Sequence, residues 1–176
     1  MSEFVSDLKK IKERARAHME QGAVTQNYKA DIKAVLKVLN DVLATEIVCT
    51  LRYRRHYFMA AGLNSEGAKA EFLQHANEEQ QHADWIATRI TQLNGEPNFN
   101  PEGLSSRAHS EYAEGKDLTS MIREDLFAER IAIESYSEII RWLGTDDPTT
   151  RKLIEDILKT EEEHAEDLKT LLEKMS

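Results

Sequence analysis

The sequence has little cysteine, glycine or proline, and each shortage excludes a class of protein. One cysteine, Cys49, allows neither an intrachain disulfide framework nor a Cys₄ metal site within one chain. Seven glycines and three prolines leave few breaks in 176 residues, and the polar segments are rich in Glu, Lys, Arg, Gln and Ala. The composition therefore predicts an all-α protein, and the length suits one domain.

Long hydrophobic runs and a surplus of basic residues are also missing. No apolar run approaches the roughly 20 residues of a membrane span. The start Met-Ser-Glu-Phe-Val lacks the basic-then-apolar order of a signal peptide, so we expect a cytoplasmic protein. A formal net charge of −9 argues against general affinity for nucleic acid but suits a protein that attracts cations.

Two Glu-x-x-His motifs occupy positions that should be apolar. Glu79 and His82 form the first motif, and Glu161 and His164 form the second. Three residues are close to one helical turn, so the carboxylate and the imidazole of each motif project from one helix face. The other positions of that face are hydrophobic in both segments, which predicts that the face is buried. A buried carboxylate is costly unless a cation compensates it.

Two further glutamates precede these motifs at matched distances. Glu46 lies 33 residues before Glu79 (79 − 46), and Glu129 lies 32 residues before Glu161 (161 − 129). Both midpoints fall at turns, so each pair of helices should fold back and place its two glutamates at one level. Four helices would then contribute one Glu each, with a His added on two of them, which is the di-iron carboxylate pattern.

Helical periodicity divides the bundle into two hairpins joined by a crossover. The four long helices are expected at about 31–61, 65–93, 117–143 and 147–172, with turns at Gly62-Leu63 and Thr145. Asp117 and Asp147-Pro148 are typical helix starts. Residues 95–116 are too many for a turn between neighbours and suit the long crossover of a ferritin-like four-helix bundle, with a short helix from Leu104 to Tyr112. We assign residues 31–174 to this bundle and expect no fifth helix after it.

Residues 1–30 are interpreted as a partly helical N-terminal arm. The segment carries six Lys or Arg and four Asp or Glu, in contrast to the acidic remainder. We favour an arm that is solvated or contacts another subunit. The alternative is a basic tail that binds DNA, for which interleaved cations and anions are poorly suited.

The donor set favours iron or manganese over other metals. Carboxylates suit hard divalent cations, imidazole adds affinity for iron or manganese, and four carboxylates match two M²⁺ ions in charge. Two ferrous ions held together can each supply one electron to O₂ or H₂O₂, which is ferroxidase chemistry. Tyr53, seven residues after Glu46, either hydrogen-bonds to a ligand carboxylate or is a core aromatic residue. The other histidines are interpreted as structural, with an auxiliary role in iron entry as the alternative for His75.

The chain resembles the ferritin-like superfamily, and within it the bacterioferritin and Dps-like miniferritin branch. The resemblance covers about residues 31–172 and is most specific at 43–47, 77–84, 125–129 and 161–165. It implies a homo-oligomeric cage and two iron ions per subunit, with these ligands: Glu46 and His82 on one ion, Glu129 and His164 on the other, and Glu79 and Glu161 bridging.

Some positions depart from the pattern of this branch. Gln80 stands where bacterioferritins have the methionine that binds haem, so we expect no haem. Where thiol-bearing Dps-like proteins have cysteines, this chain has His109 and Ile131. Typical Dps proteins place their ligands between subunits, whereas this chain has the set found within one bundle. The short crossover helix and the missing fifth helix favour 12 subunits over 24.

We therefore predict an iron storage and detoxification protein with ferroxidase activity, which oxidises Fe²⁺ with O₂ or H₂O₂ at an intra-subunit di-iron centre. One alternative is a non-storage di-iron or di-manganese oxidoreductase of the peroxidase or catalase type. A second is a Dps-like protein that protects DNA, and a third is a helical scaffold without metal. The oxidant and the choice of iron or manganese stay open at this point.

Overall fold

The structure is a computed structural model that describes residues 5–62 and 65–175. Its long helices are α2 (Ile32–Met59), α3 (Ser65–Gln92), α5 (Leu118–Leu143) and α6 (Pro148–Lys174). The described residues contain no strand, so the all-α prediction is confirmed. Leu63 of the first predicted turn lies outside the described residues, and none of the described helices is long and apolar enough to cross a bilayer.

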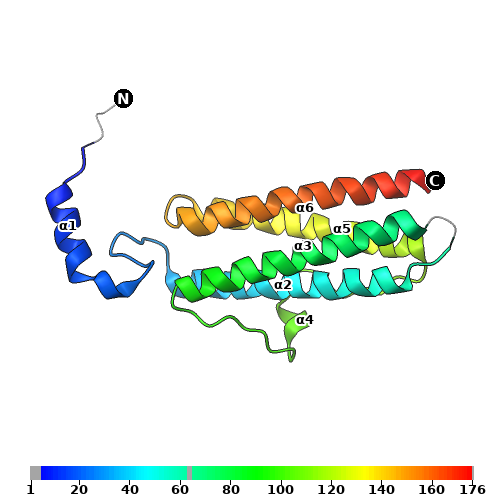
Figure 1. The fold of residues 1–176 in the computed structure, drawn as a ribbon, viewed down its shortest axis with the longest axis horizontal. Helices are drawn as coiled ribbons and strands as arrows, with labels where there is room; N and C mark the ends of the chain where they lie inside the picture. Colours follow the sequence, from blue (N-terminus) through cyan, green and yellow to red (C-terminus); the bar gives the residue numbers. More distant parts are fainter. Residues whose placement is uncertain (1–4, 63–64, 176) are drawn as a thin grey trace.

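The four long helices form two antiparallel hairpins that pack side by side (Figure 1). α2 pairs with α3, and α5 pairs with α6. Figure 1 shows that α3 and α5 run in the same direction, so the chain between them travels the length of the bundle. This is the predicted four-helix bundle with a long crossover.

The helix starts follow from capping residues. Asp117 forms a capping box with Ser120 at the start of α5. Asp147 accepts the backbone N–H of Thr150 at 2.9 Å, and Pro148 follows at the first helical position of α6. Both predicted starts are confirmed.

The crossover contains a shorter helix than expected. α4 (Leu104–Arg107) is four residues long and does not extend to residue 112. After α4 the chain lies along α2, where the backbone N–H of His109 donates to the Thr45 hydroxyl at 2.9 Å. Because this N–H is used by α2, it cannot continue the helical hydrogen-bond pattern.

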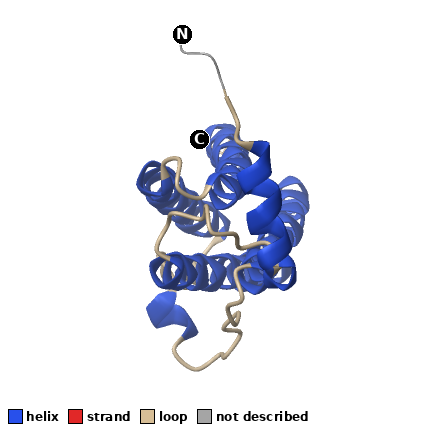
Figure 2. Ribbon diagram, turned by 90° about the vertical axis from the view of Figure 1, so that its left-hand side faces the viewer, coloured by secondary structure: helices blue, strands red, loops and turns tan. Residues whose placement is uncertain are grey.

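The N-terminal arm consists of α1 (Leu8–Ala17), a 3₁₀ turn (Met19–Gln21) and a loop with two further turns that leads to α2. α1 has no buried residue, and it lies across one end of the bundle in Figure 2. The end of the arm contacts the bundle, because the Tyr28 hydroxyl donates a hydrogen bond to Asp147 at 2.8 Å. Asp147 also accepts a hydrogen bond from Arg89 at 2.9 Å.

The core consists of two apolar clusters separated by polar side chains. One cluster includes Leu43, Ala83 and Ile157, and the other includes Phe72, Ile122 and Leu168. On each long helix one buried glutamate lies between residues of the two clusters. These four glutamates form the centre described next.

Candidate metal centre

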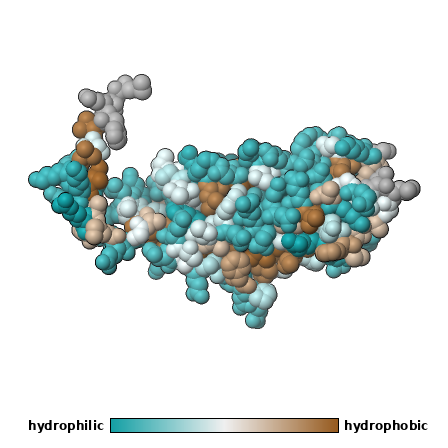
Figure 3. All heavy atoms as spheres, in the orientation of Figure 1, coloured by the Kyte–Doolittle hydropathy of each residue, from teal (hydrophilic) through white to brown (hydrophobic). Residues whose placement is uncertain are grey.

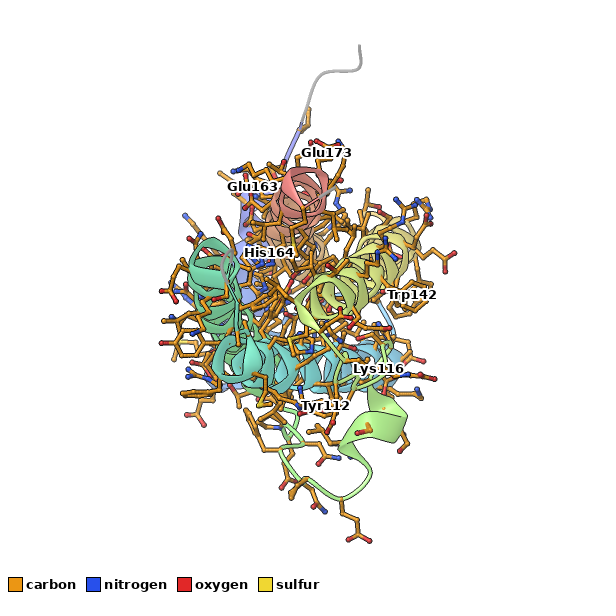
Figure 4. All side chains as sticks on the ribbon, turned by 90° about the vertical axis from the view of Figure 1, so that its right-hand side faces the viewer. Tyr112, Lys116, Trp142, Glu163, His164 and Glu173 are labelled. Atoms are coloured by element: carbon orange, nitrogen blue, oxygen red, sulfur yellow. The ribbon has the colours of Figure 1, made fainter. Side chains whose placement is uncertain are left out.

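The six predicted ligands lie together at mid-height of the bundle. Each long helix contributes one glutamate, and each is at most 1% exposed. α3 and α6 add a histidine one turn after their glutamate. Figure 4 shows His164 on the inward side of α6, whereas the preceding residue, Glu163, lies on the outer side.

The donor atoms form two overlapping groups. The first consists of Glu46, Glu79, His82 and Glu161, and the second of Glu79, Glu129, Glu161 and His164. Within each group, one donor atom from every residue lies within 4.8 Å of the others. Glu79 and Glu161 belong to both groups, so the arrangement has two adjacent positions for a cation and two carboxylates between them.

The two imidazoles lie against the carboxylates. His82 Nδ1 is 3.2 Å from Glu46 Oε2 and 3.0 Å from Glu161 Oε1. His164 Nδ1 is 3.4 Å from Glu161 Oε2 and 3.6 Å from Glu79 Oε1. Both histidines thus direct Nδ1 to the shared glutamates.

Burial and mutual repulsion shift the pKa values of the residues in the centre. Burial and the charge of Glu79 raise the pKa of Glu46 to about 8. Burial and the charges of Glu79 and Glu161 raise the pKa of Glu129 as well. Burial lowers the pKa of His164, but the carboxylates of Glu161 and Glu79, 3.4 and 3.6 Å from Nδ1, outweigh it and raise this pKa to about 12. The raised pKa values of Glu46 and Glu129 show that the negative charge of this buried site favours binding of a positive charge, either a proton or a cation.

Several buried donor atoms of the centre have no hydrogen-bond partner among the described residues. They are Glu79 Oε1, Glu129 Oε2, both carboxylate oxygens of Glu161, and His164 Nδ1. An unpaired buried polar atom is costly, and buried atoms of this kind indicate an absent ion or water. Oxygen and imidazole donors around two positions fit a pair of divalent transition-metal ions.

Two tyrosines contact the carboxylates from the opposite hairpin. The Tyr53 hydroxyl donates to Glu129, which decides between the two interpretations of Tyr53 in favour of the hydrogen bond. The Tyr136 hydroxyl donates to Glu46, a contact that the sequence analysis missed. A signal was present, because Tyr136 follows Glu129 by seven residues just as Tyr53 follows Glu46.

Further polar residues around the centre were also missed. Glu78 accepts a hydrogen bond from His164 Nε2 at 2.7 Å, which orients the ring with Nδ1 inward. Asp125 is fully buried and binds Arg52 Nε at 2.8 Å and His56 Nδ1 at 2.7 Å. Nothing in the spacing of these residues distinguishes them from surface charges. Cys49 is buried, in agreement with its interpretation as a small core residue.

The fold and the paired carboxylate and imidazole groups are those of a ferritin-like protein. Residues 36–176 match the ferritin family, described as a ferritin-like domain. The chain is 30% identical to bacterioferritin of Mycobacterium tuberculosis over 142 residues, which are 80% of this chain and 85% of the relative. Bacterioferritin of Desulfovibrio desulfuricans is 28% identical over 131 residues, 74% of this chain and 69% of that protein. The chain belongs to the ferritin-like family, as the resemblance in its sequence indicated.

Solved structures agree with this assignment. The bacterioferritin-related protein of Bacteroides fragilis, described as a dodecameric thioferritin, superposes with a TM-score of 0.81 at 29% identity. The match covers 95% of this chain and 94% of that chain. Dps from Thermosynechococcus elongatus has a TM-score of 0.76 at 22% identity, covers 80% of this chain and 90% of its own, and is similar in fold.

Proposed function

We propose that this protein oxidises Fe²⁺ with O₂ or H₂O₂ at a dinuclear centre within each subunit and stores the ferric product in a homo-oligomeric cage in the cytoplasm. The observation that carries the proposal is the pair of overlapping donor groups that share Glu79 and Glu161. Iron is the substrate here, and the protein supplies two adjacent positions from which two electrons can reach one oxidant.

In this proposal the six residues have three roles. Glu46 and His82 hold one Fe²⁺, and Glu129 and His164 hold the other. Glu79 and Glu161 bridge the two ions, because each lies in both groups. The carboxylates that bind a single ion are oriented by hydrogen bonds, that of Glu129 by Tyr53 and that of Glu46 by Tyr136.

Two observations support assembly into a cage. Large apolar side chains are exposed, among them Phe58 at 75%, Phe127 at 64% and Trp142 at 51%. In Figure 3 hydrophobic residues gather along the edge formed by α2 and α4. Exposed apolar surface of this kind indicates contact with other protein chains. We favour 12 subunits over 24, in line with the bacterioferritin-related neighbour described as dodecameric.

Two measurements test the proposal together. The native mass should be about 240 kDa for 12 chains of 20.2 kDa, and air-oxidised iron should elute with the protein. Fast aerobic Fe²⁺ oxidation should be lost in Glu79→Ala and Glu161→Ala, with the helical circular dichroism retained. Glu163→Ala, exposed on the outer side of α6, is the matched control and should oxidise Fe²⁺ normally. Unchanged oxidation in both centre variants would refute the site.

The mass also distinguishes the proposal from the alternatives. A monomer or dimer that oxidises Fe²⁺ has no cavity for mineral, and its centre would belong to a di-metal oxidoreductase without storage. Salt-sensitive DNA retardation that is lost on deleting residues 1–30 would favour DNA protection.

A further inference from the structure

His75 on α3 is a buried histidine that the proposed centre does not use. Its side chain is fully buried, and among the described residues neither ring nitrogen has a hydrogen-bond partner. An unsatisfied buried polar atom costs about 1–3 kcal/mol. An apolar side chain could pack here without this cost, so we expect the imidazole to have a partner.

Two carboxylates lie near one of these ring nitrogens, Nε2. His75 Nε2 is 3.7 Å from Glu71 Oε2 and 3.7 Å from Asp167 Oδ2. These distances are too long for hydrogen bonds. The three donor atoms nevertheless lie within 4.8 Å of one another, the separation at which one metal ion can contact all three. Glu71 comes from α3 and Asp167 from α6, so the two hairpins share this cluster.

The charges of this cluster suit a cation. Burial and the neighbouring carboxylates of Asp167 and Glu78 raise the pKa of Glu71, and Lys174 offsets this effect only in part. The imidazole of His75 adds a nitrogen donor, which binds metals in its neutral form.

The cluster connects solvent with the dinuclear centre. The side chains of Glu71 and Asp167 are 34% and 51% exposed, so an ion can reach them from outside. The His75 ring stacks on the His164 ring, with centroids 3.9 Å apart and planes at 23°. His75, Glu78 and His164 form another group of potential ligands, and His164 directs its Nδ1 to the centre. Donor atoms are thus continuous from the surface to the shared glutamates.

We propose that Glu71, His75 and Asp167 form a third divalent-cation site in each subunit, at which Fe²⁺ is held before it passes Glu78 and His164 to the dinuclear centre. Two carboxylate oxygens and one imidazole nitrogen suit Fe²⁺, Mn²⁺ or Co²⁺, and solvent completes the coordination. As a holding site it must bind more weakly than the centre it supplies. The inference rests on the proposed function, because it assigns a route to the same centre.

The test uses a double variant that neutralises the two half-exposed ligands. Glu71→Gln/Asp167→Asn changes the charge but neither the shape nor the buried His75. Glu66→Gln/Glu163→Gln is the matched control, because it removes one exposed carboxylate from each of the same two helices. Equilibrium dialysis of the assembled protein against Co²⁺ should give about three ions per subunit in the wild type and the control, and about two in the double variant.

Kinetics test the route itself. A first addition of two Fe²⁺ per subunit should be oxidised in the double variant, because the centre is intact. Successive additions should be oxidised about tenfold more slowly than in the wild type and the control, since the centre refills without the acidic entrance. Two Co²⁺ per subunit in the wild type, or three in the double variant, would overturn the third site. Equal rates of successive oxidation in the double variant and the control would overturn the route.

These outcomes separate the inference from the proposed function. If the wild type binds two Co²⁺ per subunit and oxidises Fe²⁺, the proposed function is supported and the third site is refuted. If the wild type oxidises no Fe²⁺, the proposed function is refuted. The third site would still be supported if one Co²⁺ per subunit were bound by the wild type and the control but not by Glu71→Gln/Asp167→Asn.

Discussion

The hydroxyl of Tyr136 on α5 donates a hydrogen bond to the carboxylate of Glu46 on α2, in the opposite hairpin. Tyr53 on α2 donates in the same way to Glu129 on α5. Each tyrosine therefore orients the glutamate that lies on the partner helix, seven residues before the other tyrosine. The two ion positions are tied to each other across the bundle by these contacts.

Replacing each tyrosine should weaken a different ion position. We expect Tyr136→Phe to weaken the position of Glu46 and His82, and Tyr53→Phe to weaken that of Glu129 and His164, each by about 10- to 100-fold in metal affinity. Stepwise Co²⁺ titration followed by absorption measures both affinities. Tyr57→Phe, on the same helix as Tyr53 and away from the carboxylates, is the control and should titrate as the wild type. Equal weakening of both positions by either variant would contradict the pairing.

Metal binding should release protons. Burial and the neighbouring carboxylates raise the pKa of Glu46 to about 8 and that of Glu129 above its usual range, and the carboxylates raise the pKa values of both imidazoles. Divalent ions that bind here should therefore displace protons, and the apparent affinity should rise as the pH increases from 6 to 8. Titration calorimetry in buffers of different ionisation enthalpy measures the number. Binding without proton release would show that the carboxylates and imidazoles are not the ligands.

The buried Asp125 should be important for stability and for the position of the crossover. It is paired with Arg52 and His56, which also bind the backbone carbonyls of Glu111 and Ala113 in the crossover. Asp125→Asn leaves the Arg52 charge buried without its partner, which should cost about 3–5 kcal/mol of the free energy of unfolding. Urea denaturation measures this loss, and hydrogen exchange should increase in residues 108–116.

A control for this variant is available on the same helix. Glu134→Gln removes an exposed carboxylate from α5 and should change the free energy of unfolding by no more than about 0.5 kcal/mol. An Asp125→Asn variant as stable as this control would mean that the pair with Arg52 contributes nothing to the fold.

The sequence was sufficient for the architecture and for the glutamates of the centre. The constant rise of a helix converts the matched separations of Glu46 from Glu79 and of Glu129 from Glu161 into a common level. A polar residue within an apolar stripe can be recognised from the sequence alone, which is why both Glu-x-x-His motifs could be identified. The structure brings all six residues together, and their role as metal ligands stays a prediction for experiment.

Contacts between distant segments could not be read from the sequence. Tyr136 lies on an apolar stripe and there resembles any core aromatic residue, so its bond to Glu46, 90 residues away, depends on packing between hairpins. Arg52 resembles a surface cation until Asp125, 73 residues later, is placed beside it. The crossover helix was expected to be longer because its end is set by His109 and Thr45 rather than by a local stop signal.

In the proposed centre, one subunit holds two ions between Glu79 and Glu161. Crystals soaked anaerobically with Fe²⁺ and measured at the iron absorption edge test it most directly. We predict two anomalous peaks per subunit about 3.5–4 Å apart, one beside Glu46 and His82 and the other beside Glu129 and His164. A single peak, or peaks that lie only outside these six residues, would refute a dinuclear centre at this place.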